Sequence, residues 1–129
     1  MKYQVVKASD LTVKLVKGTD TAKLTIDTVV YDKTTYTIIE IGDKAFNGCK
    51  NKLKKVTVGA NVATIGKSAF KGCKKLANVA IKNNSKLSKV GNGAFKKTSS
   101  KIKIKLANNL KKNKKIKNQL KKAGIKKGL

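Results

Sequence analysis

Hydrophobic and polar residues alternate in several short segments of the chain. Three of these segments are residues 53–58, 76–81 and 102–104. Alternation with a period of two predicts a β-strand with one buried face. Val56, Val79 and Ile102 are therefore expected to point into a core, and they recur at intervals of 79 − 56 = 23 and 102 − 79 = 23 residues.

A second pattern lies between the alternating segments. The block Ile-Gly-Asp-Lys-Ala-Phe-Asn-Gly-Cys at residues 41–49 returns in similar form at 65–73 and 90–98, at offsets of 24 and 25 residues. Within the block, Ile65, Ala69 and Cys73 are four residues apart, as on one face of a short helical turn. Each repeat unit is thus predicted to contain one strand and one turn of helix.

A unit of 23 to 25 residues cannot bury its own apolar face, so the copies must stack on one another. Stacking would place Phe46, Phe70 and Phe95 in one ladder inside the molecule. Val56, Val79 and Ile102 would form a second ladder. These residues are interpreted as the core of a solenoid and not as a binding motif.

The repeated pattern Ile-Gly-x-x-Ala-Phe-x-Gly-Cys-x-x-Leu-x-x-Val-x-Ile resembles the BspA-like class of bacterial surface leucine-rich repeats. The resemblance implies an α+β repeat protein, a short right-handed solenoid with about three repeats in residues 41–105. It also implies export to the cell surface or beyond and a role in adhesion. Two departures are visible: Gly59 and its neighbours replace a proline that is common after the strand, and Thr98 stands where a third cysteine is expected.

Residues 1–40 are predicted to form an antiparallel β cap on the first repeat. Several short alternating runs support this prediction: residues 3–6, 11–16, 24–26, 29–31 and 36–41. The sequence Asp32-Lys33-Thr34 is a candidate turn between the last two runs, with Tyr31 and Tyr36 close to the join.

Residues 106–129 are predicted to form a lysine-rich capping helix and tail, which completes a single domain over residues 1–129. Leu110, Ile116, Leu120 and Ala123 fall on one face of this helix, and Gly124 would end it. A helix lying on a membrane surface is an alternative. Its apolar stripe would be narrow and would lack Trp and Phe, which favours the capping role.

Charge is distributed very unevenly in this sequence. The net charge is +26, yet all six Asp and Glu residues precede residue 44, where six lysines balance them. The other 32 − 6 = 26 basic residues lie in residues 44–129, and every basic residue of the chain is lysine. One hypothesis is attraction of polyanions; the alternative is a lysine-biased composition that forms an ordinary solvated surface.

The residue types of this chain do not favour an enzyme. The chain has no histidine, and its carboxylates are confined to the predicted N-terminal cap. We therefore predict no enzyme activity, no cofactor and no metal. Cys49 and Cys73 occupy equivalent repeat positions; two buried free thiols are favoured, and a disulfide between stacked repeats stays open.

The outward face of the repeat strands is the predicted ligand surface. Its candidate residues are Lys55, Thr57, Asn78, Ala80, Lys82, Lys101, Lys103 and Lys105. The expected partner is an extracellular protein or glycan, or an anionic polymer such as teichoic acid or a sulfated glycan. Nucleic acid is expected to bind only non-specifically, because the basic part has no Tyr or Trp on which bases could stack. A wall-attachment or spacer module of a larger exported protein is a further alternative.

Targeting signals are not evident. No run of about 18 apolar residues predicts a transmembrane helix, and the first residues lack the apolar core of a signal peptide. An extracellular or cell-surface location is therefore inferred from the resemblance alone, with the chain as a fragment or a mature domain.

Overall fold

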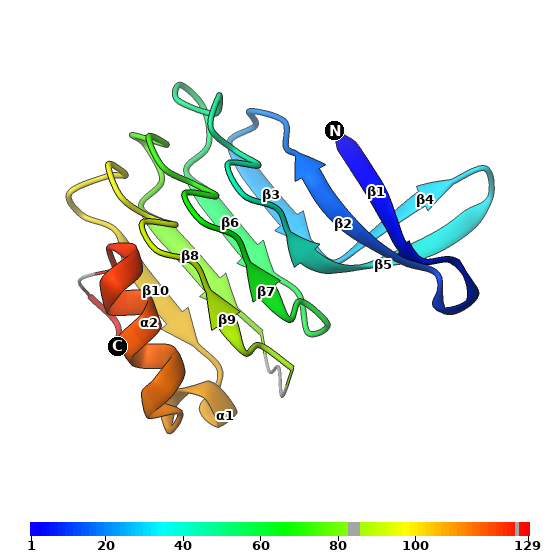
Figure 1. The fold of residues 1–129 in the computed structure, drawn as a ribbon. Helices are drawn as coiled ribbons and strands as arrows, with labels where there is room; N and C mark the ends of the chain where they lie inside the picture. The colour runs from blue at the N-terminus through cyan, green and yellow to red at the C-terminus, as the bar shows by residue number, and fades with distance from the viewer. Residues whose placement is uncertain (83–85, 126) are drawn as a thin grey trace.

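The fold is a solenoid with two β-sheets as walls (Figure 1), seen in a computed structural model that describes residues 1–82, 86–125 and 127–129. One sheet contains β1 (Lys2–Lys7), β2 (Thr12–Lys17), β4 (Thr28–Tyr31), β5 (Thr34–Ile41), β7 (Thr64–Ile65) and β9 (Lys89–Val90). The other sheet contains β3 (Lys23–Ile26), β6 (Lys55–Val58), β8 (Asn78–Ile81) and β10 (Lys103–Leu106).

The chain coils through about four turns, each of which supplies one strand to each sheet. Strands β2, β5, β7 and β9 pair in parallel on one wall, and β3, β6, β8 and β10 pair in parallel on the other. The predicted leucine-rich-repeat solenoid is confirmed. The alternation is the cause, since it gives each short strand one apolar face to bury.

Stacked turns form the third side of the solenoid and carry the phenylalanine ladder. The rings of Phe46 and Phe70 have centroids 4.6 Å apart, and those of Phe70 and Phe95 are 5.2 Å apart. The backbone N–H of Phe46 donates to the carbonyl of Ala69 at 2.7 Å, so the turns are hydrogen-bonded as well as packed. The predicted ladder is confirmed.

The expected turn of helix in each repeat is instead a series of β-turns. Ala45 N–H donates to the Gly42 carbonyl at 3.2 Å and Cys49 N–H to the Phe46 carbonyl at 3.0 Å, each a bond between residues three apart. Lys44 and the equivalent Ser68 have left-handed backbones, with φ of 57° and 55°. A helix needs consecutive right-handed residues, so these positions prevent one.

The register of the last strand differs from the expected spacing. Val56 pairs with Val79, as predicted, but Val79 pairs with Ile104 and not with Ile102. Ile102 is buried just before β10 begins. The alternation of β10 is unchanged by this shift, because Ile102 and Ile104 have the same parity.

The N-terminal segment supplies strands to both walls. β1 pairs antiparallel with β2, and β4 pairs antiparallel with β5 through the predicted turn, where Asp32 and Lys33 have φ of 48° and 63°. The short helix η1 (Ala8–Asp10) joins β1 to β2. The two antiparallel pairs are linked by a parallel pairing of β2 with β5. Residues 23–26, assigned above to the cap, pair in parallel with β6 like the other repeat strands.

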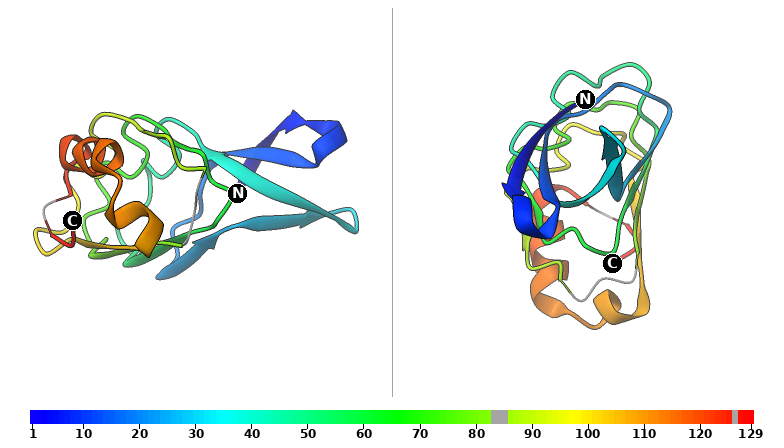
Figure 2. Two further views of the ribbon diagram at one scale, coloured as in Figure 1. Left: turned by 90° about the horizontal axis from the view of Figure 1, so that it is seen from below. Right: turned by 90° about the vertical axis from the view of Figure 1, so that its right-hand side faces the viewer.

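The C-terminal end is closed by helices α1 (Asn108–Lys111) and α2 (Lys114–Ala123). Ile116, Leu120 and Ala123 are buried on one face of α2, and Gly124, with φ of 115°, ends the helix as predicted. The Phe95 N–H donates to the Ala123 carbonyl at 2.8 Å, so the helix continues the ladder of turns. Figure 2 shows α2 and the β4–β5 hairpin at opposite ends of an elongated molecule.

No helix within the described residues is long and apolar enough to cross a membrane.

Candidate functional site

The four-stranded sheet presents an outward face built from aligned rows of side chains, which we call the strand face. Lys23, Lys55, Asn78 and Lys103 form one row, each in register with the next. The second row contains Thr25, Thr57, Ala80 and Lys105. Neighbouring strands are about 4.8 Å apart, so the first row spans about 14 Å along the solenoid axis.

The predicted surface residues all lie on or beside this face. Lys55, Thr57, Asn78, Lys103 and Lys105 belong to strands β6, β8 and β10. Lys82 directly follows β8, and Lys101 lies just before β10; both are exposed. The opposite faces of the same strands are buried, which leaves only the predicted side free to meet a ligand.

A shallow open groove of about 580 Å³ crosses the face between β6 and the C-terminal tail. Lys55, Asn78, Lys103 and Lys105 line it together with Lys111, which α1 supplies. The tail adds a further lysine, because Lys127 forms a parallel β-bridge with Lys103. Positive charge therefore surrounds the groove on more than one side.

Sequence reasoning missed three lysines of this region. A signal for Lys23 was present, because Lys23-Leu-Thr-Ile in β3 matches Lys55-Val-Thr-Val in β6 residue by residue. Lys111 and Lys127 carry no comparable signal. Their place depends on how the helices and tail fold back over the last repeat.

Carboxylates of the chain serve structural contacts at a distance from the groove. The Asp20 carboxylate accepts the backbone N–H groups of Asn51, Lys52 and Leu53 at 3.3, 3.1 and 3.0 Å. Asp43 accepts the N–H of Lys67 in the next turn at 2.7 Å. These carboxylates hold neighbouring turns together.

Two further carboxylates form ion pairs within the N-terminal segment. Lys7 and Asp10 lie 3.3 Å apart, and Lys14 and Glu40 lie 3.1 Å apart. The lysines of the strand face are not partners in these pairs, so they keep their charge available for an external ligand.

Both cysteines are free and buried. Burial raises the pKa of the Cys73 thiol to about 12, with smaller contributions from Cys49 and Asp20. Burial also raises the pKa of Cys49. The Cys73 thiol donates to the Phe46 carbonyl at 3.3 Å. Both cysteines belong to the buried core.

The fold and this exposed sheet define a leucine-rich-repeat protein of the solenoid type. A sequence model of the BspA type leucine rich repeat region matches residues 26–121 in six copies. The chain therefore belongs to this family. Members are generally binding modules without catalysis, and the family is consistent with protein interaction.

Two solved structures are similar to this chain. A leucine rich cell surface protein from Faecalibacterium prausnitzii A2-165 is 31% identical, with a TM-score of 0.65, over 79% of this chain and 28% of that one. A leucine-rich repeat protein from Bacteroides ovatus ATCC 8483 shares the fold at 22% identity, with a TM-score of 0.53, over 81% of this chain and 35% of that one. The chain thus spans about a third or less of either protein. No curated protein matches it.

Proposed function

We propose that the chain is a non-catalytic, adhesin-like interaction module that binds an extracellular protein or glycan through its strand face. Family membership and the cell-surface protein among the similar structures support this role and an extracellular or cell-surface location. The main observation is the row Lys23, Lys55, Asn78 and Lys103, which presents aligned polar side chains on a hydrogen-bonded sheet.

A rigid sheet suits recognition because its backbone is ordered before the ligand arrives. Each strand of the face is hydrogen-bonded to its neighbours and packed on the core through its other side. Little conformational entropy is then lost on binding beyond that of the lysine side chains themselves. A solenoid also offers an extended surface, which suits a macromolecule better than a small ligand.

Capture of an anionic polymer, such as teichoic acid or a sulfated glycan, is the second candidate. It is favoured by the lysines around the groove and by the lack of carboxylates in residues 44–129. Wall attachment in a longer exported protein would use the same charge. Nucleic acid would bind such a surface without sequence preference, because lysine contacts phosphate but reads no bases.

The test compares two variants of equal charge. Lys55→Glu with Lys103→Glu alters the strand face, whereas Lys112→Glu with Lys115→Glu alters exposed positions beside and on α2. Each pair lowers the net charge from +26 to 26 − 4 = +22. Binding of both variants and of the unaltered chain is measured against matrix proteins, neutral glycans, lipoteichoic acid and heparin.

We expect the strand-face variant to bind its ligand at least about tenfold more weakly than the unaltered chain. The affinity of the helix variant should stay within about twofold. Equal losses in both variants would mean that net charge alone attracts the ligand, and would contradict a binding face. The two candidates differ in salt dependence. A flexible polyanion that pairs five of its anionic groups with lysines should bind with a slope of about −3.5 in a plot of log K against log salt, by analogy with single-stranded nucleic acid. An adhesin contact should depend little on salt.

A further inference from the structure

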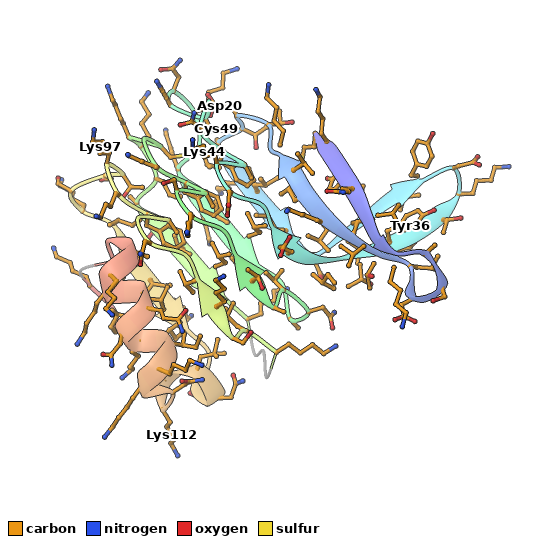
Figure 3. All side chains as sticks on the ribbon, in the orientation of Figure 1. Asp20, Tyr36, Lys44, Cys49, Lys97 and Lys112 are labelled. Atoms are coloured by element: carbon orange, nitrogen blue, oxygen red, sulfur yellow. The ribbon has the colours of Figure 1, made fainter. Side chains whose placement is uncertain are left out.

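The N-terminal end of the molecule contains an apolar cleft of about 540 Å³, which we call the tyrosine cleft. It opens between β1–β2 and the β4–β5 hairpin, two pairs of strands that diverge in Figure 2. Tyr3, Tyr31 and Tyr36, which are all the tyrosines of the chain, line it with valines, and all the lining side chains are uncharged. Figure 3 shows Tyr36 at this end and Lys112 beside the helices at the other.

This end is also where apolar side chains remain exposed. Tyr31 is 74% exposed, Val30 65% and Val5 55%. Among the described residues, every large hydrophobic side chain that is exposed belongs to residues 1–31. Four of them, Met1, Val5, Val30 and Tyr31, line the tyrosine cleft. Exposed apolar side chains gathered around one cleft are typical of an interaction site.

The edge strands β1 and β4 differ in how well they are protected against pairing with a strand of another chain. β1 has a lysine at each end, Lys2 and Lys7, a common device against pairing with another chain. Among the described strands β4 pairs with β5 alone. Its residues Thr28–Tyr31 carry no charge, and Asp27 and Asp32 flank it. An uncharged open edge with β-branched and aromatic side chains is able to accept another strand.

A sugar would fit this cleft poorly. The polar side-chain groups lining it are the tyrosine hydroxyls, and that of Tyr3 already donates to the sulfur of Met1 at 3.1 Å. Carbohydrates need several hydrogen-bond partners to replace their lost water. An apolar surface with an extended edge is therefore the better match.

The distribution of charge favours a second copy of the chain as the occupant of the cleft. Residues 1–43 carry six carboxylates and six lysines, whereas the remainder carries the whole net charge of +26. Two copies that met through the C-terminal part would bring lysines together. Two copies that met through the tyrosine cleft would join the parts without net charge, with the basic parts directed away from each other.

Salt ions reduce the repulsion that remains between the basic parts of two copies in this arrangement. Three strand spacings of about 4.8 Å separate β3 from β10, or about 14 Å in each copy. The Debye length is about 8 Å at physiological ionic strength. Lysines of the two copies that lie farther apart than this length repel each other only weakly.

We propose that the tyrosine cleft binds a second copy of this chain, in a two-fold pair formed through the N-terminal ends. Each β4–β5 hairpin places its exposed Val30 and Tyr31 against the cleft of the other copy, and the open β4 edges face each other. The same patch serves both copies, as a two-fold interface requires. The strand faces stay free, so this association is independent of the proposed ligand binding.

Sedimentation of the full chain over a range of concentrations tests the proposal, with Val5→Lys and Val6→Lys as matched variants. Both valines lie on β1 with similar exposure, 55% and 52%, but only Val5 lines the cleft. We expect the unaltered chain to change from monomer to dimer as concentration rises. Val5→Lys should weaken the dimer at least about tenfold, and Val6→Lys should leave it within about twofold.

Salt distinguishes this association from the proposed function. Screening of the basic parts should strengthen the dimer as salt rises, whereas polyanion binding weakens. Tyrosine fluorescence gives a second readout, because the chain has no tryptophan and all its tyrosines line the cleft. Dimerisation should lower quenching by acrylamide.

Three results would overturn the proposal. One is a chain that sediments as a monomer at every concentration and salt level. Another is a dimer that Val5→Lys and Val6→Lys weaken equally. The third is a monomer whose tyrosines become protected only when phospholipid vesicles are added, which would assign the cleft to a lipid surface.

Discussion

Glycines at three equivalent repeat positions allow successive turns to approach closely. Gly42, Gly66 and Gly91 follow the strands β5, β7 and β9. A Cβ at Gly66 would lie 2.5 Å from the backbone nitrogen of Asp43 and 2.6 Å from the carbonyl carbon of Gly42. Backbone on both sides of the contact leaves no room for a side chain, so the repeat glycine is a packing requirement.

Replacement of Gly66 by alanine should therefore destabilise the fold. Overpacking against backbone costs about 1–3 kcal/mol, which urea unfolding followed by circular dichroism would measure. Gly48→Ala is the control, because a Cβ there meets nothing within 4 Å. Gly48→Ala should be neutral or slightly stabilising. Equal effects of the two substitutions would contradict the close approach.

The buried thiol of Cys73 should make stability depend on alkaline pH. The folded state keeps the thiol protonated up to a pKa of about 12, whereas the ordinary value is 9.0. Between these values the unfolded state binds fewer protons than the folded state, so the free energy of unfolding falls as pH rises. The contribution is fully present below pH 9 and is lost as pH rises toward 12.

Comparison with Cys73→Ala isolates this effect from lysine deprotonation, which affects both proteins. The difference in free energy of unfolding between the unaltered chain and Cys73→Ala should narrow from neutral pH to about pH 11. Urea unfolding at each pH measures it. A constant difference would mean that the Cys73 pKa is not raised in the folded state.

At the scale of elements, helix α2 provides hydrogen-bond acceptors for the last turn of the solenoid. Its backbone provides the Ala123 carbonyl, which accepts from Phe95, and a side chain provides a second acceptor. The Gln119 side-chain oxygen accepts the backbone N–H of Val90 in β9 at 2.6 Å. Val90 lies at the end of the sheet, where the next strand of the wall would otherwise accept this bond. Gln119 thus takes the place of a strand.

Gln119→Ala should leave the buried Val90 N–H without its partner and cost about 1–3 kcal/mol. Asn118→Ala is the control, since Asn118 is an exposed neighbour on the same helix. Both substitutions raise helix propensity, Asn118→Ala by more than Gln119→Ala, so a loss of stability in Gln119→Ala cannot come from propensity. Thermal unfolding compares the variants, and hydrogen exchange at Val90 reports the bond directly. Unchanged exchange at Val90 in Gln119→Ala would contradict the capping contact.

At the scale of the whole molecule, self-repulsion opposes folding. The net charge of +26 is concentrated in residues 44–129, which fold into a few short turns. The core and the backbone hydrogen bonds between turns outweigh this repulsion. Because exposed charges are screened by salt, the balance should shift measurably with ionic strength.

Stability should therefore rise as salt is raised from low to physiological ionic strength. A gain of about 1 kcal/mol corresponds to an increase of about 4 °C in Tm for a chain of this size. Differential scanning calorimetry at low protein concentration measures it without interference from association. The variant Lys112→Glu with Lys115→Glu, at a net charge of +22, should respond less. A salt-independent Tm would show that the lysines are too far apart to repel.

Local periodicity in the sequence determined most of the architecture. The repeat of about 24 residues predicted the solenoid, the phenylalanine ladder and the outward lysines of β6 and β10, because each of these depends on which side of its own strand or turn a residue occupies. The capping helix and its end at Gly124 could also be predicted from the sequence, because they depend on local apolar spacing and on a single glycine. The expected helical turn was wrong, since the left-handed backbone of Lys44 and Ser68 leaves no mark on apolar spacing.

Only the tertiary structure decided how these pieces meet. Three examples join residues distant in sequence: the pairing of Ile104 with Val79, the pairing of Lys23 with Lys55, and the place of Lys111 at the groove. The gathering of three tyrosines in one cleft is a fourth. Such neighbours are set by strand register and by how the ends fold over the repeats. The physical reason is that alternation specifies the face of a strand, whereas its lateral partner depends on packing of the whole chain.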